Sequence, residues 1–401
     1  MLPYVKINFA NGALGSVAPS ADNVVGLVCT AVAVPNKLEL LKPYILYRMA
    51  GLEDLGVTEE GDNAYLYKVV EDFYAQAGDG AELWIYGVPT TVSPSQAVDV
   101  TANYAKDLIQ RANGRLRGMA IAFNPAAGYT PTIEDGLDSD VMIAAQKAQA
   151  LAEWATNIKF APLVVFIEGR GFSNDTITDL PELTSFGYNR VGILIGDTTV
   201  SSTGAAIGIL LGKMASIPVQ RHIGRVRDGA LKMLKAYIGD KDAALADAET
   251  LNNKGFITFR TFVGKSGYFF SDDCLATAIS DDYHSIANRR VIDKAYRIAY
   301  QTMLEHVNDE LPITDQGTPV AAMVKSWETE VQNAIVNQMT AQGELGNDPN
   351  DPNDMGVKVF IDYTQNIVST SRLNMTVQVK PYGYSKYIDV ELGFITISKE
   401  D

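Results

Sequence analysis

The last third of the chain begins with Gly267-Tyr268-Phe269-Phe270-Ser271-Asp272-Asp273 and continues into a helix predicted over Asp282–Leu311. Apolar residues return every three or four positions along this helix, which is typical of a helix that packs against a core. The stripe consists of Ile292, Ala295, Ala299, Met303, Val307 and Leu311. Pro312 and the turn-forming residues 314–317 end the pattern. We therefore predict one long, core-facing helix here.

A second helix is predicted from Thr318 to Gly343, with Thr318 as its N-cap and Pro319 at its first position. A polar loop over residues 343–356 follows it. Three closing strands are then predicted, because apolar and polar residues alternate in 357–361, 373–379 and 388–392. This alternation indicates a sheet with one buried face, so the C-terminal part is predicted to be α+β.

The earlier part of the chain alternates short apolar runs with helical stretches. The runs are Val24–Val32, Leu83–Tyr86, Met119–Phe123, Leu163–Ile167 and Val191–Ile195. The helices predicted between them are Ala64–Gln76, Ser95–Asn113, Asp140–Asn157 and Ser202–Met214, with a further helix near Lys241–Leu251. Nearly continuous apolar runs are typical of strands buried on both faces. The order predicts βαβ units and a mostly parallel sheet, hence the α/β class.

We divide the chain into an N-terminal arm over residues 1–20, a βαβ-rich domain over 21–257 and a C-terminal domain over 258–401, which ends in an arm over 385–401. The net charge of −15 disfavours nucleic acid as a general partner. The two cysteines, Cys29 and Cys274, give no disulfide framework, which fits a reducing compartment. Because we find neither a signal-peptide pattern nor an apolar run near ~18 residues, we expect synthesis in the cytoplasm and no membrane insertion.

The order of elements in the last third resembles the C-terminal domain of contractile tail sheath proteins of phages, pyocin-type particles and related injection systems. The matching features are the Gly267–Asp273 entry, the long helix and the second helix that ends at a glycine-bounded loop. The paired strands and the terminal Tyr387-Ile388-Asp389-Val390-Glu391-Leu392 complete the match. Because one chain carries both halves, it looks more similar to phage or pyocin-type sheaths than to the two-chain type VI secretion sheath.

This resemblance implies a structural, mechanical function. Sheath subunits stack as rings around an inner tube in an extended lattice, and a trigger at the baseplate lets that lattice contract and drive the tube through a target envelope. The implied partners are further copies of the chain, as a helical homo-oligomer, the inner tail tube protein, and baseplate and terminator proteins. The implied location is a phage tail or injection particle that assembles after synthesis in a bacterial cytoplasm.

Both ends of the chain carry strand-like segments. The residues that form them are Tyr4, Val5, Ile7 and Phe9 at one end, and Ile388, Val390, Leu392 and Phe394 at the other. Sheath relatives use such arms to extend a neighbour's sheet, so the resemblance implies intersubunit arms here. The alternative for the N-terminal segment is a frayed terminus or a strand of its own domain.

One helix face carries a concentration of basic residues. Arg290, Lys294 and Arg297 stand at positions i, i+4 and i+7 of the long helix and therefore share a face. The stripe is either an ordinary solvated face or a docking face for an acidic protein partner. In sheath proteins the C-terminal domain lines the inner tube, so the resemblance makes the tube that partner.

We expect no catalytic residue, cofactor or bound metal. Residues 208–214 superficially resemble a phosphate-binding loop, but the spacing is one residue short and Met214 replaces the Mg²⁺-binding hydroxyl, so a packed helix is predicted. The three histidines lack a second histidine or cysteine at metal-ligand spacing. The competing interpretation is an enzyme on a doubly wound sheet, with Gly169–Ser173 and Gly196–Ser202 lining a site at the carboxyl ends of the strands.

Overall fold

The computed structural model describes residues 22–394. The chain forms two compact units, residues 1–310 and 311–401. The predicted arm over residues 1–20 lies outside the described residues. The predicted domain boundary falls after residue 257, whereas this division groups the long helix with the first unit.

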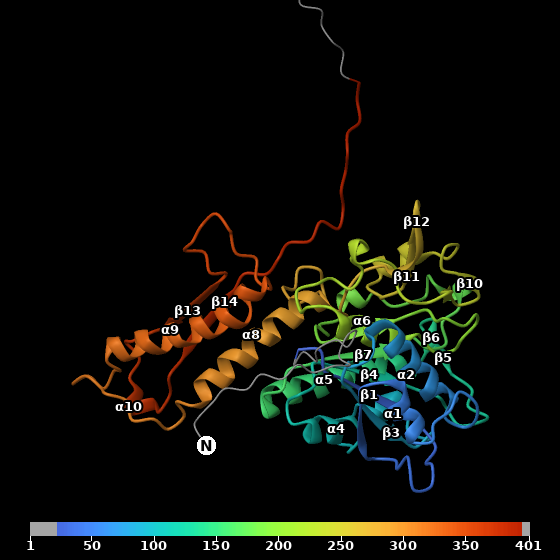
Figure 1. The fold of residues 1–401 in the computed structure, drawn as a ribbon, viewed down its shortest axis with the longest axis horizontal. Helices are drawn as coiled ribbons and strands as arrows, with labels where there is room; N and C mark the ends of the chain where they lie inside the picture. The colour runs from blue at the N-terminus through green and yellow to red at the C-terminus, as the bar shows by residue number, and fades with distance from the viewer. Residues whose placement is uncertain (1–21, 395–401) are drawn as a thin grey trace, which may run out of the picture. The chain divides into compact units, whose positions relative to one another are not determined.

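The first unit is built on a six-stranded sheet of order β2-β3-β1-β4-β7-β8 (Figure 1). Its strands are β1 Val25–Thr30, β2 Pro43–Leu46, β3 Leu83–Val88, β4 Gly118–Ala122, β7 Val164–Glu168 and β8 Val191–Leu194. All neighbours are parallel except β2, which runs antiparallel to β3. The five parallel strands are buried at every position, as their continuous apolar runs predict. The predicted α/β class is confirmed.

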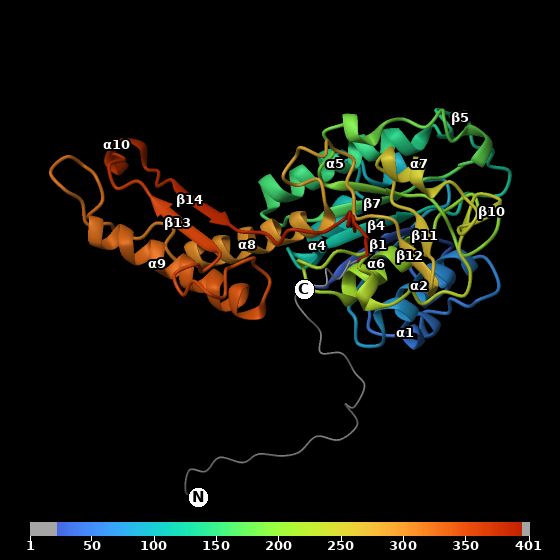
Figure 2. The ribbon, with the colours of Figure 1, turned by 90° about the horizontal axis from the view of Figure 1, so that it is seen from above.

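Helices cover both faces of this sheet (Figure 2). The helices of the first unit are α1 Met49–Asp54, α2 Ala64–Ala77, α3 Pro94–Ala97, α4 Ala105–Ala112, α5 Asp140–Lys159, α6 Ile207–Ser216, α7 Ala248–Asn253 and α8 Ile286–Leu304. Gly118 of β4 faces Met214 of α6, which packs along α2. Gly26 of β1 lies on the opposite face and meets Leu108 of α4. The result is the three-layer arrangement of a doubly wound fold.

Helix α6 contains the sequence that superficially resembles a phosphate-binding loop. A Cβ added at Gly208 would lie 2.1 Å from the carbonyl oxygen of Val69, and one added at Gly212 would lie 2.6 Å from that of Phe73. Both carbonyls belong to α2, so the two glycines let the helix backbones approach closely. Lys213 is buried, with its Nζ 4.0 Å from Asp228. The predicted packed helix is confirmed.

Two helices predicted in the first unit are built differently. The single helix expected over Ser95–Asn113 is divided into α3 and α4, because the carboxylate of Asp99 accepts the N–H and the O–H of Thr101 and forms a turn. The helix expected near Lys241–Leu251 is a short hairpin followed by α7. The small antiparallel pairs of this unit are β5 Ile133–Glu134 with β6 Leu137–Asp138, β9 Tyr237–Ile238 with β10 Lys241–Asp242, and β11 Phe259–Phe262 with β12 Lys265–Phe270.

Helix α8 is shorter than the predicted Asp282–Leu311. It begins after Ser285, whose hydroxyl accepts the N–H of Asn288 as an N-cap. It ends at Leu304. Beyond it, Asn308 has a left-handed φ of 69°, which is incompatible with a right-handed helix. None of the helices described is both long and apolar enough to cross a membrane.

The second unit contains α9 Ala321–Gln338, β13 Val357–Ile361, the short α10 Ile367–Thr370 and β14 Met375–Val379. Helix α9 starts two residues later than predicted, because the carbonyl of Thr318 accepts a hydrogen bond from the N–H of Thr314 and Pro319 pairs with Ile313 in a small bridge. β13 and β14 form an antiparallel pair that packs on α9. Both strands match the predicted alternation.

The third predicted closing strand, Ile388–Leu392, is absent from the described structure. Residues 381–394 have no regular secondary structure, and no third strand joins β13 and β14 within the described part of this unit. Within the single chain this segment does not join the β13–β14 sheet, and its assignment as an intersubunit arm stays a prediction. Residues 388–392 keep the alternation of apolar and polar side chains, but they pair with no strand among the described residues.

Candidate functional site

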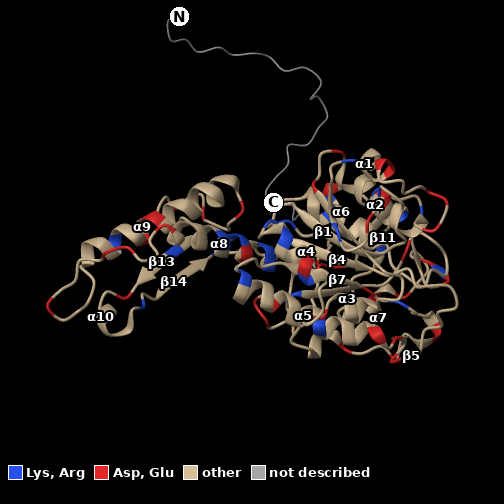
Figure 3. Ribbon diagram, turned by 90° about the horizontal axis from the view of Figure 1, so that it is seen from below, with Lys and Arg blue, Asp and Glu red and all other residues tan. Residues whose placement is uncertain are grey.

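The basic residues predicted to face a tube lie on α8, along which Lys and Arg recur in Figure 3. Arg290 and Lys294 are only 3% and 8% exposed, and the side chain of Arg297 is 11% exposed. The interpretation of this stripe as a solvated face is therefore wrong. The helical spacing does bring the three side chains to one place, because all three contact residues 22–23.

These side chains hold the first described residues of the chain. Lys294 Nζ lies 2.6 Å from Asp22 Oδ2, and Arg297 Nη2 lies 3.2 Å from Asp22 Oδ1. Arg290 Nη2 donates to Asn23 Oδ1 at 3.3 Å and to a backbone carbonyl, that of Ile217, at 3.0 Å. We call Asp22, Asn23, Arg290, Lys294 and Arg297 the Asp22 cluster.

The electrostatics of the Asp22 cluster favour the ion pairs. Burial raises the pKa of Asp22, but the hydrogen bond and the charge of Lys294, with the charge of Arg297, outweigh it, so the pKa is lowered overall. The basic stripe thus has an internal role. Its contact with a tube stays a prediction, and reversing these charges would disturb the fold as well as any docking.

A second buried ion pair fixes the neighbouring face of α8. Arg190, at the start of β8, donates to both carboxylate oxygens of Asp293 at 2.9 and 3.1 Å, and Arg289 reaches the same carboxylate at 2.8 Å. Sequence reasoning missed both Asp22 and Asp293. Asp22 is 275 residues from Arg297, and no local pattern marks an acidic residue that pairs at such a separation.

The predicted arm residues of the C-terminus are exposed. The relative solvent exposure is 77% at Ile388, 78% at Val390, 97% at Leu392 and 103% at Phe394. A row of large apolar side chains in water is unfavourable by about 25 cal/mol for each Å² that a partner could bury. Tyr4, Val5, Ile7 and Phe9, the predicted arm residues of the N-terminus, lie outside the described residues. The assignment of both arms stays a prediction.

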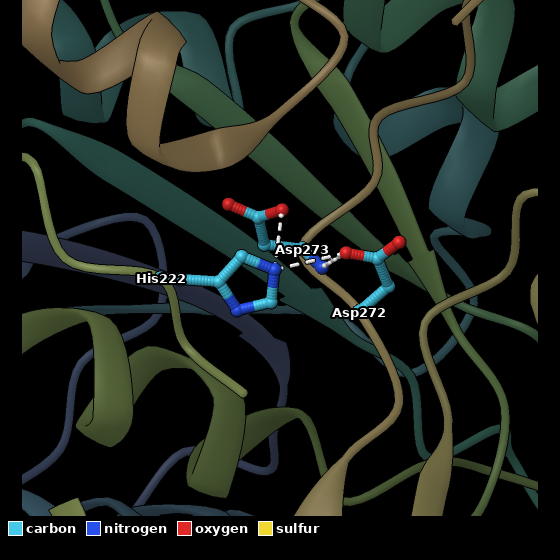
Figure 4. A group of neighbouring side chains, drawn as sticks. All are labelled: His222, Asp272 and Asp273. Carbon is cyan, nitrogen blue, oxygen red and sulfur yellow. Dashed lines mark hydrogen bonds and ion pairs between the residues drawn. The ribbon is translucent and has the colours of Figure 1, made fainter. Parts of the chain in front are cut away.

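His222, Asp272 and Asp273 form the one convergent group with metal-ligand chemistry among residues 22–394 (Figure 4). His222 Nε2 lies 2.9 Å from Asp272 Oδ1 and 3.0 Å from Asp273 Oδ1. Its Nδ1 accepts the backbone N–H of Gly224 at 3.0 Å, so a neutral ring carries its proton on Nε2. A charged ring carries a proton on both nitrogens and would have to give up the hydrogen bond from Gly224. A metal at Nε2 would displace the proton there, so the group as it stands is a buried, hydrogen-bonded cluster of the three side chains.

The two carboxylates set the charge of this histidine. Burial lowers the pKa of His222, but the hydrogen bonds and charges of Asp272 and Asp273 outweigh it and raise the pKa to about 9. Asp273 is fully buried, and its second oxygen accepts the N–H of Ala287 in the first turn of α8. The group therefore ties the segment around residue 222 to the beginning of α8.

The carboxyl edge of the large sheet is the place where a doubly wound enzyme binds its ligand. The topological switch lies between β1 and β4. There Thr30 donates its hydroxyl to the carbonyl of Asn124 at 2.9 Å and accepts the N–H of Asn124 at 2.6 Å, which joins the two strand ends directly. The crevice lined by Thr30, Val92 and Phe123 has no room for a water molecule.

The next strand end is also filled by the chain itself. Glu168 is 2% exposed and accepts hydrogen bonds from Tyr65 and from the N–H groups of Phe123 and Ala205. Arg170 pairs with it and donates to the carbonyl of Phe123. The segments Gly169–Ser173 and Gly196–Ser202 border a space of about 10 Å³, which is room for about one water. Glu168 and Arg170 thus have the packing of a polar core.

The chain has the fold of contractile sheath proteins. A chain of the anti-feeding prophage (AFP) baseplate matches with a TM-score of 0.62 and 14% identity, over 99% of each chain. A chain of the AFP helical sheath in the contracted state matches with a TM-score of 0.60 and 14% identity, over 100% of this chain and 99% of that one. A chain of the contracted PVC sheath complex of an extracellular contractile injection system matches with a TM-score of 0.58 and 15% identity, over 98% of this chain and 97% of that one.

The family follows from the sequence. The DUF2586 N-terminal domain matches residues 2–274, and the DUF2586 C-terminal domain matches residues 282–397. The chain belongs to the DUF2586 family. No curated protein matches it.

Proposed function

We propose that this chain is the structural subunit of a contractile sheath. It polymerises as stacked rings around an inner tube, and contraction of the polymer drives the tube through a target envelope. The observation that carries this proposal is the likeness in fold over 98–100% of the chain to subunits of contractile assemblies. The likeness includes both compact units, so it supports a function of the whole chain.

The subunits are joined by their terminal arms. Residues 388–394 present an alternating apolar row that is exposed in the single chain, and β13 and β14 form a two-stranded sheet within residues 22–394. A two-stranded sheet is marginally stable by itself and gains from a further strand. Strand addition supplies backbone hydrogen bonds, while the linkers let whole subunits rotate relative to one another.

The work of contraction comes from subunit contacts, so the proposed function is not catalytic. The partners are further copies of this chain, an inner tube protein, and baseplate and terminator proteins at the two ends of the polymer. The place of assembly is a phage tail or an injection particle, after synthesis in a bacterial cytoplasm. The space bordered by Gly169–Ser173 and Gly196–Ser202 has room for about one water, which favours this proposal over an enzyme with its site between these segments.

Deletion of residues 388–397 tests the arms. We expect a chain whose circular dichroism and unfolding midpoint equal those of the full chain, but which forms no polymers. Polymers of normal appearance from the deleted chain would show that this segment joins no subunits.

A further inference from the structure

One side of the first unit carries a concentration of positive charge. Residues 221–235 run beside β12, because Leu231 donates its N–H to the carbonyl of Tyr268 at 2.8 Å. This segment contains five Lys and Arg residues and one acidic residue, Asp228. The β11–β12 hairpin contains two more basic residues and no acidic one. In a chain with a net charge of −15, the segment and the hairpin therefore form a local cationic surface.

Most of these cations have no ion-pair partner within the described chain. Asp228 is already shared by Arg221 and Arg225, whose guanidinium nitrogens lie 3.8 and 2.9 Å from its Oδ1. The remaining five are exposed and form no ion pair among residues 22–394: Arg227, Lys232, Lys235, Arg260 and Lys265. We call these five residues the basic patch. Like charges gathered in this way repel one another, so the basic patch favours a partner that supplies carboxylates.

Two large apolar side chains stand within the basic patch. Leu234 lies between Lys232 and Lys235 in the sequence and is 99% exposed. Val263, at the turn of the β11–β12 hairpin, is 107% exposed. Apolar side chains gain free energy when a protein surface covers them, whereas nucleic acid phosphates would engage only the charges. A protein with acidic side chains therefore fits this patch better than a nucleic acid does.

The same unit carries the opposite charge on the segment that joins the end of α1 to α2. Residues 53–62 contain no Lys or Arg and hold five exposed carboxylates that form no ion pair with a described residue: Glu53, Asp54, Glu59, Glu60 and Asp62. Partial burial and the charges of Glu53, Glu71 and Glu59 raise the pKa of Tyr67, so these carboxylates lie close enough to act on one group. We call residues 53–62 the acidic loop. It supplies the charge that the basic patch lacks.

The two charged surfaces lie apart on the first unit. In Figure 1 the β11–β12 hairpin stands at the top of this unit, whereas α1 lies toward its lower side. The basic patch and the acidic loop of one copy therefore do not meet. A contact between two different surfaces of the same molecule repeats from copy to copy, and it produces a ring or a helical polymer.

We infer that the acidic loop of one copy docks on the basic patch of a second copy. This inference rests on the proposed function, because a polymer of subunits requires contacts that repeat in one direction. A second copy is favoured over another acidic partner, because the single chain carries both charges and leaves both without ion-pair partners among its described residues. Several pairs of opposite charge together fix the register of the two copies, and the contact covers Leu234 and Val263.

Zero-length cross-linking of full-length chains tests this contact. A carbodiimide joins a Lys amine to a carboxylate only where the two groups touch, and mixing isotope-labelled with unlabelled chains marks the bonds between copies by their mass. We expect intermolecular cross-links from the lysines of the basic patch to the acidic loop. Lys106 and Lys159, which lie over Trp154 in the same unit, are matched controls and should give at least ~10-fold fewer cross-links to the acidic loop.

Charge reversal tests what the contact does in the polymer. Lys232→Glu with Lys235→Glu gives each copy two acidic surfaces, and Glu59→Lys with Glu60→Lys gives each copy two basic ones. Either double variant should raise the protein concentration needed for polymers at least ~10-fold, because like charges then face one another. The chain with all four substitutions has opposite charges again, so it should return to within ~3-fold of the wild-type concentration.

The control for charge reversal is Lys106→Glu with Lys159→Glu, which makes the same change in net charge elsewhere on the unit. Equal weakening by this control overturns the inference, and so do double variants that polymerise like the wild type. A four-substitution chain that polymerises no better than either double variant also overturns it. Wild-type polymers without the expected cross-links contradict the contact alone and leave the proposed function standing. A wild-type chain that stays monomeric contradicts both.

Discussion

The ammonium nitrogen of Lys294 lies 2.6 Å from a carboxylate oxygen of Asp22. This contact joins the middle of α8 to the first described residue of the chain, beyond which the predicted N-terminal arm begins. Arg297 reaches the other oxygen of the same carboxylate at 3.2 Å. A pull on the N-terminal segment would therefore be borne by α8 as well as by β1.

Replacement of Asp22 by Asn should destabilise the first unit. The substitution removes the charge that Lys294 and Arg297 face, and leaving such partly buried donors poorly paired costs about 1–3 kcal/mol. Equilibrium denaturation measures the loss. Glu39→Gln is the control, because the Glu39–Lys42 pair is exposed and should change the free energy of unfolding by less than about 0.5 kcal/mol. Equal values for both variants would contradict the importance of the Asp22 cluster.

Gly208→Ala should destabilise the packing of α6 on α2. The added Cβ would lie 2.1 Å from the carbonyl oxygen of Val69, so one helix must shift, at a cost of about 1–3 kcal/mol or more. Gly187→Ala is the matched control, because nothing lies within 4 Å of a Cβ there. A thermal or denaturant midpoint for Gly208→Ala that equals the wild-type value would show that the two backbones are not in close contact.

The ion pair of His222 should make stability depend on pH in the alkaline range. The pKa of His222 rises from 6.5 to about 9 in the folded chain. The folded state therefore binds the proton more tightly, and the resulting stabilisation is complete below pH 6.5 and is lost as pH rises through 9. Denaturation midpoints between pH 6 and 10 measure this loss. His222→Gln should lose less stability over the same range, and an identical slope in both proteins would refute the assignment.

Lys213 provides a test of the enzyme alternative. Because Lys213 is buried within α6, we expect purified protein to show no saturable ATP turnover. Lys213→Ala should change stability alone. ATP turnover that disappears in this variant would favour a nucleotide-dependent enzyme.

The elements predicted well from sequence are those whose signal is local. The buried strands were predictable from their continuous apolar runs. The packed helix around Gly208 was predictable because residues 208–214 lack the spacing of a phosphate-binding loop. The second helix and the β13–β14 pair follow from periodicity in the same way.

The remainder depends on contacts that no local pattern marks. Arg290, Lys294 and Arg297 read as a surface stripe because Asp22 is remote in sequence. The Glu328 contact with Ile361 joins a helix to a strand edge, and its charge alone would suggest an exposed residue. The terminal segment has the alternation of a strand, but whether it pairs depends on a partner outside the single chain.

Electron microscopy of the purified full-length chain, alone and with a tube protein from the same source, tests the sheath function most directly. We expect long hollow polymers of stacked rings, with an outer wall built from this chain. The variant that lacks residues 388–397 should give folded particles without polymers. A full-length chain that remains monomeric in both conditions would contradict the sheath function.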